Sequence, residues 1–309
     1  MGTDVSIEII ADPRGLNAEK AEESIAEIKE IFSKNEKIFS RFQEDSELSL
    51  INDNLGKEMK ISREMTEVLD LCLKFNKISN GYFDPRIIGN LEKIGYDKDF
   101  TLVADLRGSD ADLRGKNIVS EKIESELADD LIINKENKTV IVKKRIDTTG
   151  IAKGWTVDEA AKYLDGLGYK NYIVDAGGDM NIKGLNNEGE KWRVGIEGME
   201  DNKLMLALTD CGVATSGISR KRWKIGEKKV HHLINPKDPE NFSHDIKTVT
   251  VIEDKTVEAD GRAKVLVLMG REKGLEFANQ NNIKALFLDY KGSVYLSETI
   301  KENIINNLK

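Results

Sequence analysis

The sequence contains few of the residues that form disulfides, metal clusters or flexible linkers. Its two cysteines, Cys72 and Cys211, have neither the spacing of a metal site nor the pattern of a disulfide framework. Cys72 lies on an apolar helical stripe, so we expect it to be a thiol of the core. Only four prolines occur in 309 residues, and no Pro-rich segment separates parts of the chain. We therefore expect a single large domain over residues 1–309.

Signals of membrane insertion, secretion and nucleic-acid binding are also missing. No segment approaches the roughly 20 consecutive apolar residues of a transmembrane helix, and no basic and then apolar leader stands at the start. The net charge of −8 argues against a general nucleic-acid binder, which would be basic. As written, the sequence indicates a cytoplasmic protein; a leader removed from before Met1 would make it exported or membrane-anchored.

What is present is a mixture of helical and strand-like segments. Helical spacing of apolar residues predicts helices near residue 25, after the N-cap Ser62, after residue 149, before Gly270 and at the C-terminus. Runs of β-branched residues predict a hairpin over residues 131–146 and further strands beyond residue 171. Because the strands cluster and do not alternate one for one with helices, the pattern favours an α+β fold.

Residues 146–168, IDTTGIAKGWTVDEAAKYLDGLG, begin with small hydroxylated residues and continue as a helix. A helix N-terminus suits an anion such as phosphate, the glycines allow the backbone to approach a ligand, and Lys153 adds positive charge. The Gly-Lys-Ser/Thr order of a P-loop is absent. Asp147 would repel phosphate, so it would bind a cation or hydrogen-bond donors. The alternative is an ordinary strand-to-helix turn, capped by Thr148 or Thr149.

Two further segments are rich in small residues. In residues 175–184, DAGGDMNIKG, a pair of glycines predicts a tight bend between two aspartates, and no helix follows as a Rossmann-type site would require. Thr215, Ser216 and Gly217 predict a hydroxyl-rich turn at the end of an apolar strand. Such a turn can hydrogen-bond phosphate or ribose, or it can be a plain turn.

Aromatic and histidine side chains supply other candidates. Tyr82 and Phe83 follow a helix end and can stack on a flat ring or pack in the core. His231 and His232 are adjacent, so on a strand they would point to opposite faces and one of them could face a site. No Cys or acidic partner stands at ligand spacing from them, which disfavours zinc.

Taken in order, these segments resemble the ApbE family of FAD:protein FMN transferases. The resemblance extends from Met1 to Gly270. Each motif alone has low specificity, but their order along the chain is specific. The matching segments are FSRFQEDSELSLIN, NGYFDP, IDTTGIAKGW, DAGGDMNIKG, VATSG, HHLINP and EADGRAKVLVLMG.

The resemblance implies a single α+β unit of mixed sheets and packed helices, related to the T-fold, that binds FAD and a divalent cation, usually magnesium. It also implies a reaction. The hydroxyl of a Thr or Ser in an acceptor protein attacks the FMN-side phosphorus of FAD, AMP leaves, and FMN stays attached through a phosphoester. The expected partners are thus FAD and an acceptor protein, without nucleic acid, and with a membrane only through a leader or lipid anchor.

The resemblance assigns site residues by position. Gly150, through its carbonyl, and Asp260 would hold the metal ion, and His232 would act as the base for the incoming hydroxyl, so that Asp260 and His232 are the catalytic candidates. The residues expected at the FAD site are Met1, Phe42, Tyr82, Phe83, Asp84, Asp147, Lys153 and Ile234, together with Thr215, Ser216 and Gly217.

Two positions depart from the family pattern. Asp260 is expected at the start of a helix, and four residues on, where the family usually has a threonine that helps to hold the cation, this sequence has Lys264. An ion pair between these two side chains is the simplest interpretation. Residues 235–241 read NPKDPEN where the family usually has Asp-Pro-x-Thr-Gly. Two alternatives therefore stay open: an FAD-binding protein without transferase activity, and an FAD pyrophosphatase that gives FMN and AMP.

Overall fold

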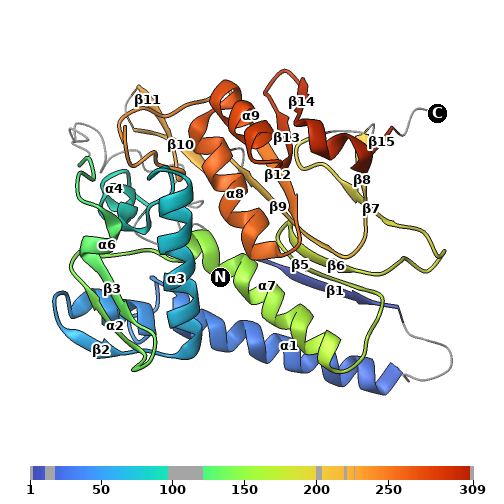
Figure 1. Cartoon of the computed structure of the whole chain (residues 1–309), viewed down its shortest axis with the longest axis horizontal. Helices are drawn as coiled ribbons and strands as arrows, with labels where there is room; N and C mark the ends of the chain where they lie inside the picture. Colours follow the sequence, from blue (N-terminus) through green and yellow to red (C-terminus); the bar gives the residue numbers. More distant parts are fainter. Residues whose placement is uncertain are drawn as a thin grey trace. The chain divides into compact units, whose positions relative to one another are not determined.

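The computed structural model describes residues 3–10, 18–96, 121–199, 204–218, 221–225 and 227–306 (Figure 1). Its contacts divide the chain into two compact units. The described part of unit 1 lies within Glu36–Ile151 and Ile218–His244. That of unit 2 lies within Thr3–Asn35, Ala152–Gly217 and Asp245–Lys309. A helix long and apolar enough to span a membrane is not found among these residues.

Unit 2 is built on a seven-stranded antiparallel sheet. In spatial order its strands are β1 (Val5–Ile9), β5 (Tyr172–Ala176), β6 (Asp179–Lys183), β9 (Cys211–Gly217), β12 (Thr248–Glu253), β13 (Lys284–Leu288) and β14 (Val294–Leu296). The expected bend between two aspartates is the turn from β5 to β6, where Gly177 and Gly178 have φ of 63° and 96°. Glycine adopts these left-handed angles without strain, which explains the pair.

Helices cover one face of this sheet. Ile28 of α1 (Ala18–Phe39) and Val157 of α7 (Thr149–Gly166) share an apolar cluster with Val174 of β5. Further along the same face, α8 (Thr256–Met269) packs on β9 and β12, and α9 (Arg271–Gln280) packs on α8. Gly212 permits this approach, because a Cβ there would lie 2.1 Å from the backbone nitrogen of Thr256. On this face, α7 thus packs on β5, and α8 packs on β9 and β12.

The other face of the sheet packs on a small antiparallel sheet. Its strands, in spatial order, are β15 (Ile304–Asn306), β8 (Leu204–Leu208) and β7 (Trp192–Gly195). Trp192 and Leu206 of this sheet share an apolar cluster with Val213 of β9 and Ile252 of β12. Strands whose side chains alternate between two buried faces explain why this part of the sequence is so rich in β-branched residues.

Unit 1 combines short strands and helices. An antiparallel sheet has the order β2 (Glu58–Lys60), β4 (Thr139–Val142), β3 (Leu131–Asn134), and β10 (Arg222–Ile225) pairs with β11 (Lys228–His231). The helical segments are α2 (Glu47–Asp53), α3 (Arg63–Ile78), the 3-10 turn η1 (Pro85–Ile87), α4 (Ile88–Lys93) and α6 (Leu127–Asp130). The Ser62 hydroxyl accepts a bond from the Met65 N–H at 3.0 Å, which confirms it as the N-cap of α3.

The α+β expectation is confirmed, and so is the core position of Cys72, which is fully buried in α3. Burial raises the pKa of this thiol. The expectation of a C-terminal helix is wrong. The segment instead forms a 3-10 helix, η3 (Glu298–Asn303), and then β15, whose Ile304 pairs with Leu206 of β8. β-branched residues beside an unpaired strand edge favour a strand there.

Candidate functional site

The entrance to α7 is organised by Asp147. One carboxylate oxygen, Oδ1, accepts a hydrogen bond from the Thr149 backbone N–H at 2.8 Å and another from the Thr149 hydroxyl. The backbone N–H of Asp147 itself donates to the Pro85 carbonyl at 2.7 Å. The cap was expected from Thr148 or Thr149. Because α7 begins at Thr149, the Asp147 carboxylate supplies it instead, by accepting from the first N–H of the helix.

Arg41 is a residue of this site that the motif analysis missed. Its Nε lies 3.1 Å from Oδ2 of Asp147, and these side chains are only 3% and 6% exposed. A second guanidinium nitrogen donates to the Tyr96 carbonyl at 2.7 Å, and the guanidinium lies 4.3 Å from the ring centre of Phe42. Arg41 thus fixes Asp147 and an aromatic ring at once. The signal in the sequence is an arginine that stands directly beside Phe42 in one of the matching segments.

Aromatic rings gather around Tyr96 in unit 1. Its ring centre lies 6.1 Å from that of Phe42, 6.1 Å from that of Trp223 and 6.3 Å from that of His232. Ile234 is buried in the same apolar cluster. The structure therefore brings three of the expected residues, Phe42, His232 and Ile234, to one aromatic surface. Tyr96 and Trp223 belong to it as well, although neither stands in a motif.

Residues 82–84 are more committed to the protein's own structure. Phe83 is 6% exposed and packs on Phe75 with ring centres 6.0 Å apart. The Asp84 carboxylate accepts from the Arg86 backbone N–H at 2.9 Å and from its guanidinium at 2.7 and 3.0 Å. Tyr82 is half-buried, with the Lys237 ammonium 5.0 Å from its ring centre. Phe83 and Asp84 thus stabilise the protein's own structure, and Tyr82 has the more accessible of the two aromatic rings.

A second group of charged side chains lies in unit 2, on α7, β6 and α8. The Lys153 ammonium lies 2.9 Å from Oδ2 of Asp179, and the Lys264 ammonium contacts Oδ1 of Asp260. Both carboxylate side chains are at most 2% exposed. Burial alone would lower the pKa of Lys153, but Asp179 and Asp260 raise it above its ordinary value, so this ammonium stays charged. Burial and the charge of Asp260 raise the pKa of Asp179.

Asp179 is a second site residue that the sequence motifs do not single out, because it flanks a predicted bend. The first position of β6 places it opposite α7. Asp260 was expected at the start of its helix. It lies instead in the second turn of α8, which begins at Thr256. The expected ion pair between Asp260 and Lys264, one helical turn apart, is present.

Gly154 serves the crossing of two helices. A Cβ at this position would lie 2.9 Å from the Thr256 carbonyl oxygen, 2.9 Å from the Val257 Cα and 3.0 Å from the Asp260 Cβ. The Gly154 N–H donates to Oδ2 of Asp260 at 3.4 Å. The close backbone approach expected here is therefore to α8, since the helices pack directly at this glycine. Gly150 lies in the first turn of α7.

Thr215, Ser216 and Gly217 form the last part of strand β9, which corrects the expectation of a turn. They pair with Thr250, Val249 and Thr248 of β12. The Thr215 hydroxyl hydrogen-bonds that of Thr250 at 2.9 Å, and a Cβ on Gly217 would lie 2.5 Å from the Lys247 carbonyl oxygen. Small residues here reflect close packing of neighbouring strands. Met1 lies outside the described residues.

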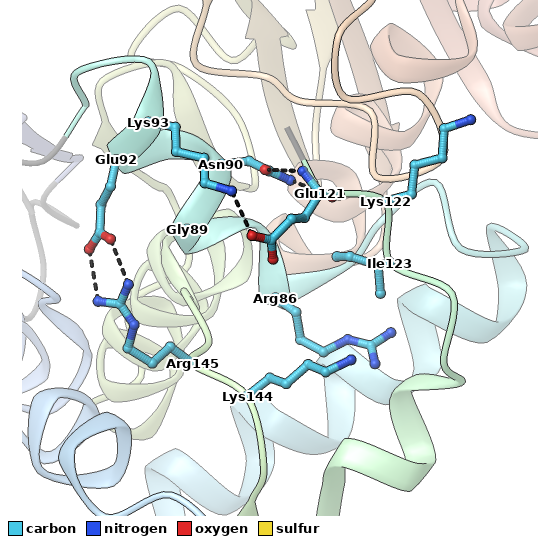
Figure 2. A pocket seen from close by; sticks show the side chains of 10 residues that line it. All are labelled: Arg86, Gly89, Asn90, Glu92, Lys93, Glu121, Lys122, Ile123, Lys144 and Arg145. Carbon is cyan, nitrogen blue, oxygen red and sulfur yellow. Dashed lines mark hydrogen bonds and ion pairs between the residues drawn. The ribbon is translucent and has the colours of Figure 1, made fainter. Parts of the chain in front are cut away.

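Unit 1 contains a cavity of about 540 Å³, and Figure 2 shows the side chains that line it. Many of its lining charges are paired with one another: Arg145 binds Glu92 through two bonds of 2.6 and 2.9 Å, and Lys93 binds Glu121 at 2.8 Å. None of the expected site residues lines it. Within the described part of the chain, no three or more His, Cys, Asp or Glu side chains gather as metal ligands would.

Known proteins match almost the whole chain. The ApbE family model matches residues 1–287. The FAD:protein FMN transferase of Vibrio cholerae is 28% identical over 93% of this chain and 85% of its own length. That of Haemophilus influenzae is 29% identical over 92% of this chain and 82% of its own length.

Solved structures agree. The flavin transferase ApbE of Vibrio cholerae superposes with a TM-score of 0.75 at 25% identity, over 98% of this chain and 96% of that one. The flavinyl transferase ApbE of Pseudomonas stutzeri shares the fold, with a TM-score of 0.77 at 23% identity over 98% of this chain and 94% of that one. The chain belongs to the ApbE family.

Proposed function

We propose that this protein is an FAD:protein FMN transferase. The observation that carries the proposal is the match of the ApbE family model to residues 1–287, with curated relatives of that name at 28% and 29% identity. In the proposed reaction a Ser or Thr hydroxyl oxygen of an acceptor protein bonds to the FMN-side phosphorus of FAD. The bond between that phosphorus and the bridging oxygen breaks, AMP leaves with the bridging oxygen, and the hydroxyl proton passes to a base.

The aromatic surface of unit 1 suits the flavin. Phe42 and Trp223 are half-buried and offer rings on which a flat isoalloxazine can stack, and the buried Tyr96 and Ile234 pack in the same apolar cluster and support them. Asp147 lies at the start of α7 with its carboxylate oriented by Arg41 and Thr149. A carboxylate held this way can accept a hydrogen bond from FAD without first being ordered, which lowers the entropic cost of binding.

His232 is the proposed base. Its Nδ1 lies 3.4 Å from the Lys221 carbonyl oxygen, and its ring packs edge-on to Tyr96. A carbonyl can only accept, so this contact favours the tautomer with the proton on Nδ1 and a lone pair on Nε2. Nε2 is then the atom that takes the proton of the incoming hydroxyl.

Lys153 supplies positive charge for the pyrophosphate. Phosphoryl transfer depends mainly on positioning and on stabilising negative charge on the phosphoryl oxygens. The ammonium of Lys153 is held by Asp179 and is 25% exposed, so it is fixed but not sealed from a ligand. The hydroxyl-rich end of β9 would add weaker hydrogen bonds through Thr215.

Magnesium is the part of the expected chemistry that the side chains around Asp260 support least. The resemblance assigns the ion to the Gly150 carbonyl and to Asp260. Mg²⁺ prefers six oxygen ligands in octahedral geometry. Oδ1 of Asp260 is instead in contact with the Lys264 ammonium, and Oδ2 faces the Gly154 N–H. These residues do not fit a magnesium site.

The proposal is tested by mixing the protein with FAD and candidate acceptor proteins. We expect flavin fluorescence on an acceptor band in a denaturing gel, together with one AMP for each FMN attached. Nucleotide chromatography separates the alternatives. FMN and AMP free in solution would indicate a pyrophosphatase, and bound, intact FAD would indicate a binding protein.

Replacing the proposed base gives a sharper test. His232→Asn should slow FMN transfer about 10²–10⁴-fold, the usual contribution of a general base, with little change in FAD affinity. His244→Asn is the matched control, because His244 is exposed and its ring contacts the buried His231 ring. Equal transfer rates for the two variants would remove His232 from this role.

A further inference from the structure

Lys264 lies on the same face of α8 as Asp260, one helical turn later. Its ammonium contacts Oδ1 of the Asp260 carboxylate, and the two side chains are 18% and 2% exposed. We propose that Lys264 supplies the fixed positive charge at Asp260 in place of a divalent cation, so that FMN transfer by this protein needs no metal ion. The inference rests on the proposed function and concerns how that site is built.

The first support is the charge of the cluster. Asp179 and Asp260 carry two negative charges, and Lys153 and Lys264 carry two positive charges, arranged as two ion pairs. The charges of these four side chains therefore balance before any ligand binds, and the nearby Glu197 also raises the pKa of Lys153. A divalent cation at Asp260 would add two positive charges beside two ammonium groups in a mostly buried region, where like charges repel strongly. A metal ion would have to displace Lys264 first.

The second support is the set of donors. A divalent cation such as Mg²⁺ needs several oxygen ligands. In the described residues no cluster of three or more His, Cys, Asp or Glu side chains exists. Asp179 is engaged by Lys153, and Asp260 is engaged by Lys264 and by the Gly154 N–H. The position that would complete a ligand set, one turn after Asp260, holds a donor group instead of an oxygen.

The third support is what an ammonium can do. It carries three N–H donors, so one contact with Asp260 leaves others for phosphate oxygens. Because Lys264 is 18% exposed, a ligand can reach it. A single charge stabilises a phosphoryl group less than a divalent ion does, and Lys153 supplies the second charge. Two ammonium groups, each held by a buried carboxylate, thus replace one metal ion.

The experiment compares the wild type, Lys264→Thr and the surface control Lys273→Thr, which removes the same charge from an exposed position on α9. Binding of Mn²⁺, a paramagnetic substitute for Mg²⁺, is measured with and without FAD by the loss of the free-ion signal. FMN transfer is measured with Mg²⁺ or with a chelator. Thermal unfolding of each protein checks that it is folded.

We expect wild-type transfer to change less than about twofold between magnesium and chelator, and Lys273→Thr to behave in the same way. Lys264→Thr should bind Mn²⁺ at least about tenfold more tightly than the wild type and should lose transfer in chelator. Tight Mn²⁺ binding by the wild type, or loss of its transfer in chelator, would overturn the inference and leave the proposed function standing. If neither the wild type nor the variants bind FAD, the proposed function is overturned. The comparison of Mn²⁺ binding without FAD would then still test the role of Lys264.

If Lys264→Thr does not fold, Lys264→Met keeps the length of the side chain and removes its charge. It should lose transfer in chelator while the wild type retains it. Equal transfer by wild type and Lys264→Met under chelator would show that the ammonium is dispensable and would overturn the inference.

Discussion

Two adjacent histidines at the end of β11 have different surroundings. His231 is 4% exposed, and its Nε2 lies 3.0 Å from the Ser243 carbonyl oxygen, so Nε2 carries the proton. The rings of Phe242 and His244 meet it edge-on, with centres 5.1 and 5.3 Å away. His232 is only half-buried and faces Tyr96. One histidine thus packs inside the loop, and its neighbour is the more accessible of the two.

This burial predicts sensitivity to acid. Burial lowers the pKa of His231 from 6.5 to about 4. Between these values the unfolded chain binds a proton that the folded chain does not, so stability is full above pH 6.5 and falls as the pH drops toward 4, by up to about 3 kcal/mol. Urea unfolding through this pH window measures the fall. His231→Phe should flatten it, whereas His244→Asn should not; equal slopes for wild type and His231→Phe would contradict the assignment.

Side-chain contacts within one helix could be predicted from the sequence, but contacts between distant segments could not. The pair Asp260 and Lys264 follows from helical spacing alone. The contact of Lys153 with Asp179 depends on how the β5–β6 hairpin packs against α7, which no local pattern encodes. The contact of Arg41 with Asp147 joins residues 106 positions apart. Neither Arg41 nor Asp179 carries a local sequence signal that names its partner.

At the scale of elements, α7 and α8 are held together by side-chain hydrogen bonds as well as by their close packing at Gly154. The N-cap Lys255 of α8 makes no side-chain cap bond. Asp158 of α7 replaces it: its carboxylate accepts from the backbone N–H groups of Thr256 at 2.9 Å and Val257 at 3.0 Å. A carboxylate at a helix N-terminus satisfies free donors and complements the helix dipole. The position of Asp260 is therefore fixed by α7.

The same crossing predicts the outcome of adding one methyl group. Alanine is a better helix former than glycine by about 1 kcal/mol. Gly166 also lies in α7, and a Cβ added there would have no atom within 4 Å. Gly166→Ala should therefore stabilise the protein or leave its stability unchanged. Gly154→Ala should destabilise by about 1–3 kcal/mol, because the Cβ would meet the backbone of α8. Chemical denaturation of both variants measures this. A Gly154→Ala variant as stable as Gly166→Ala would mean that the helices separate easily.

Elements with strong local signals were predictable, and those set by tertiary pairing were not. The Ser62 cap and the helix at residue 149 follow from capping and periodicity. Residues 215–217 read as a turn because Thr, Ser and Gly favour turns, yet pairing with β12 keeps them in a strand. The last described strand, β15, exists because β8 offers it an edge. Tertiary context overrode propensity in both places.

At the scale of the whole molecule, the chain passes between the two compact units after Asn35, Ile151, Gly217 and His244. One of these passages lies inside α7, whose hydrogen bonding continues from Thr149 to Gly166. If either unit unfolded, the part of α7 that belongs to the other unit would lose hydrogen bonds at its end and fray. The expectation of one domain stays a prediction, and α7 gives it a physical basis.

We therefore expect a single cooperative unfolding transition in calorimetry, with the calorimetric enthalpy equal to the van't Hoff enthalpy. Two unfolding transitions, each assignable to one unit, would show that the units are independent domains. The Gly154→Ala variant provides a check, because a defect on the unit 2 side of α7 should move the whole transition to lower temperature.

The segment Ile218–His244 leaves the large sheet after Gly217 and returns just before β12, and Gly217 pairs directly with Thr248. Its two ends are thus anchored at neighbouring points of a rigid frame. We expect insertions or deletions in this stretch to leave the pairing of β9 with β12 intact, since loop lengthening is thermodynamically inexpensive. The stretch that carries both His231 and His232 can therefore change in length without altering the strand pairing beside the helix that positions Asp260.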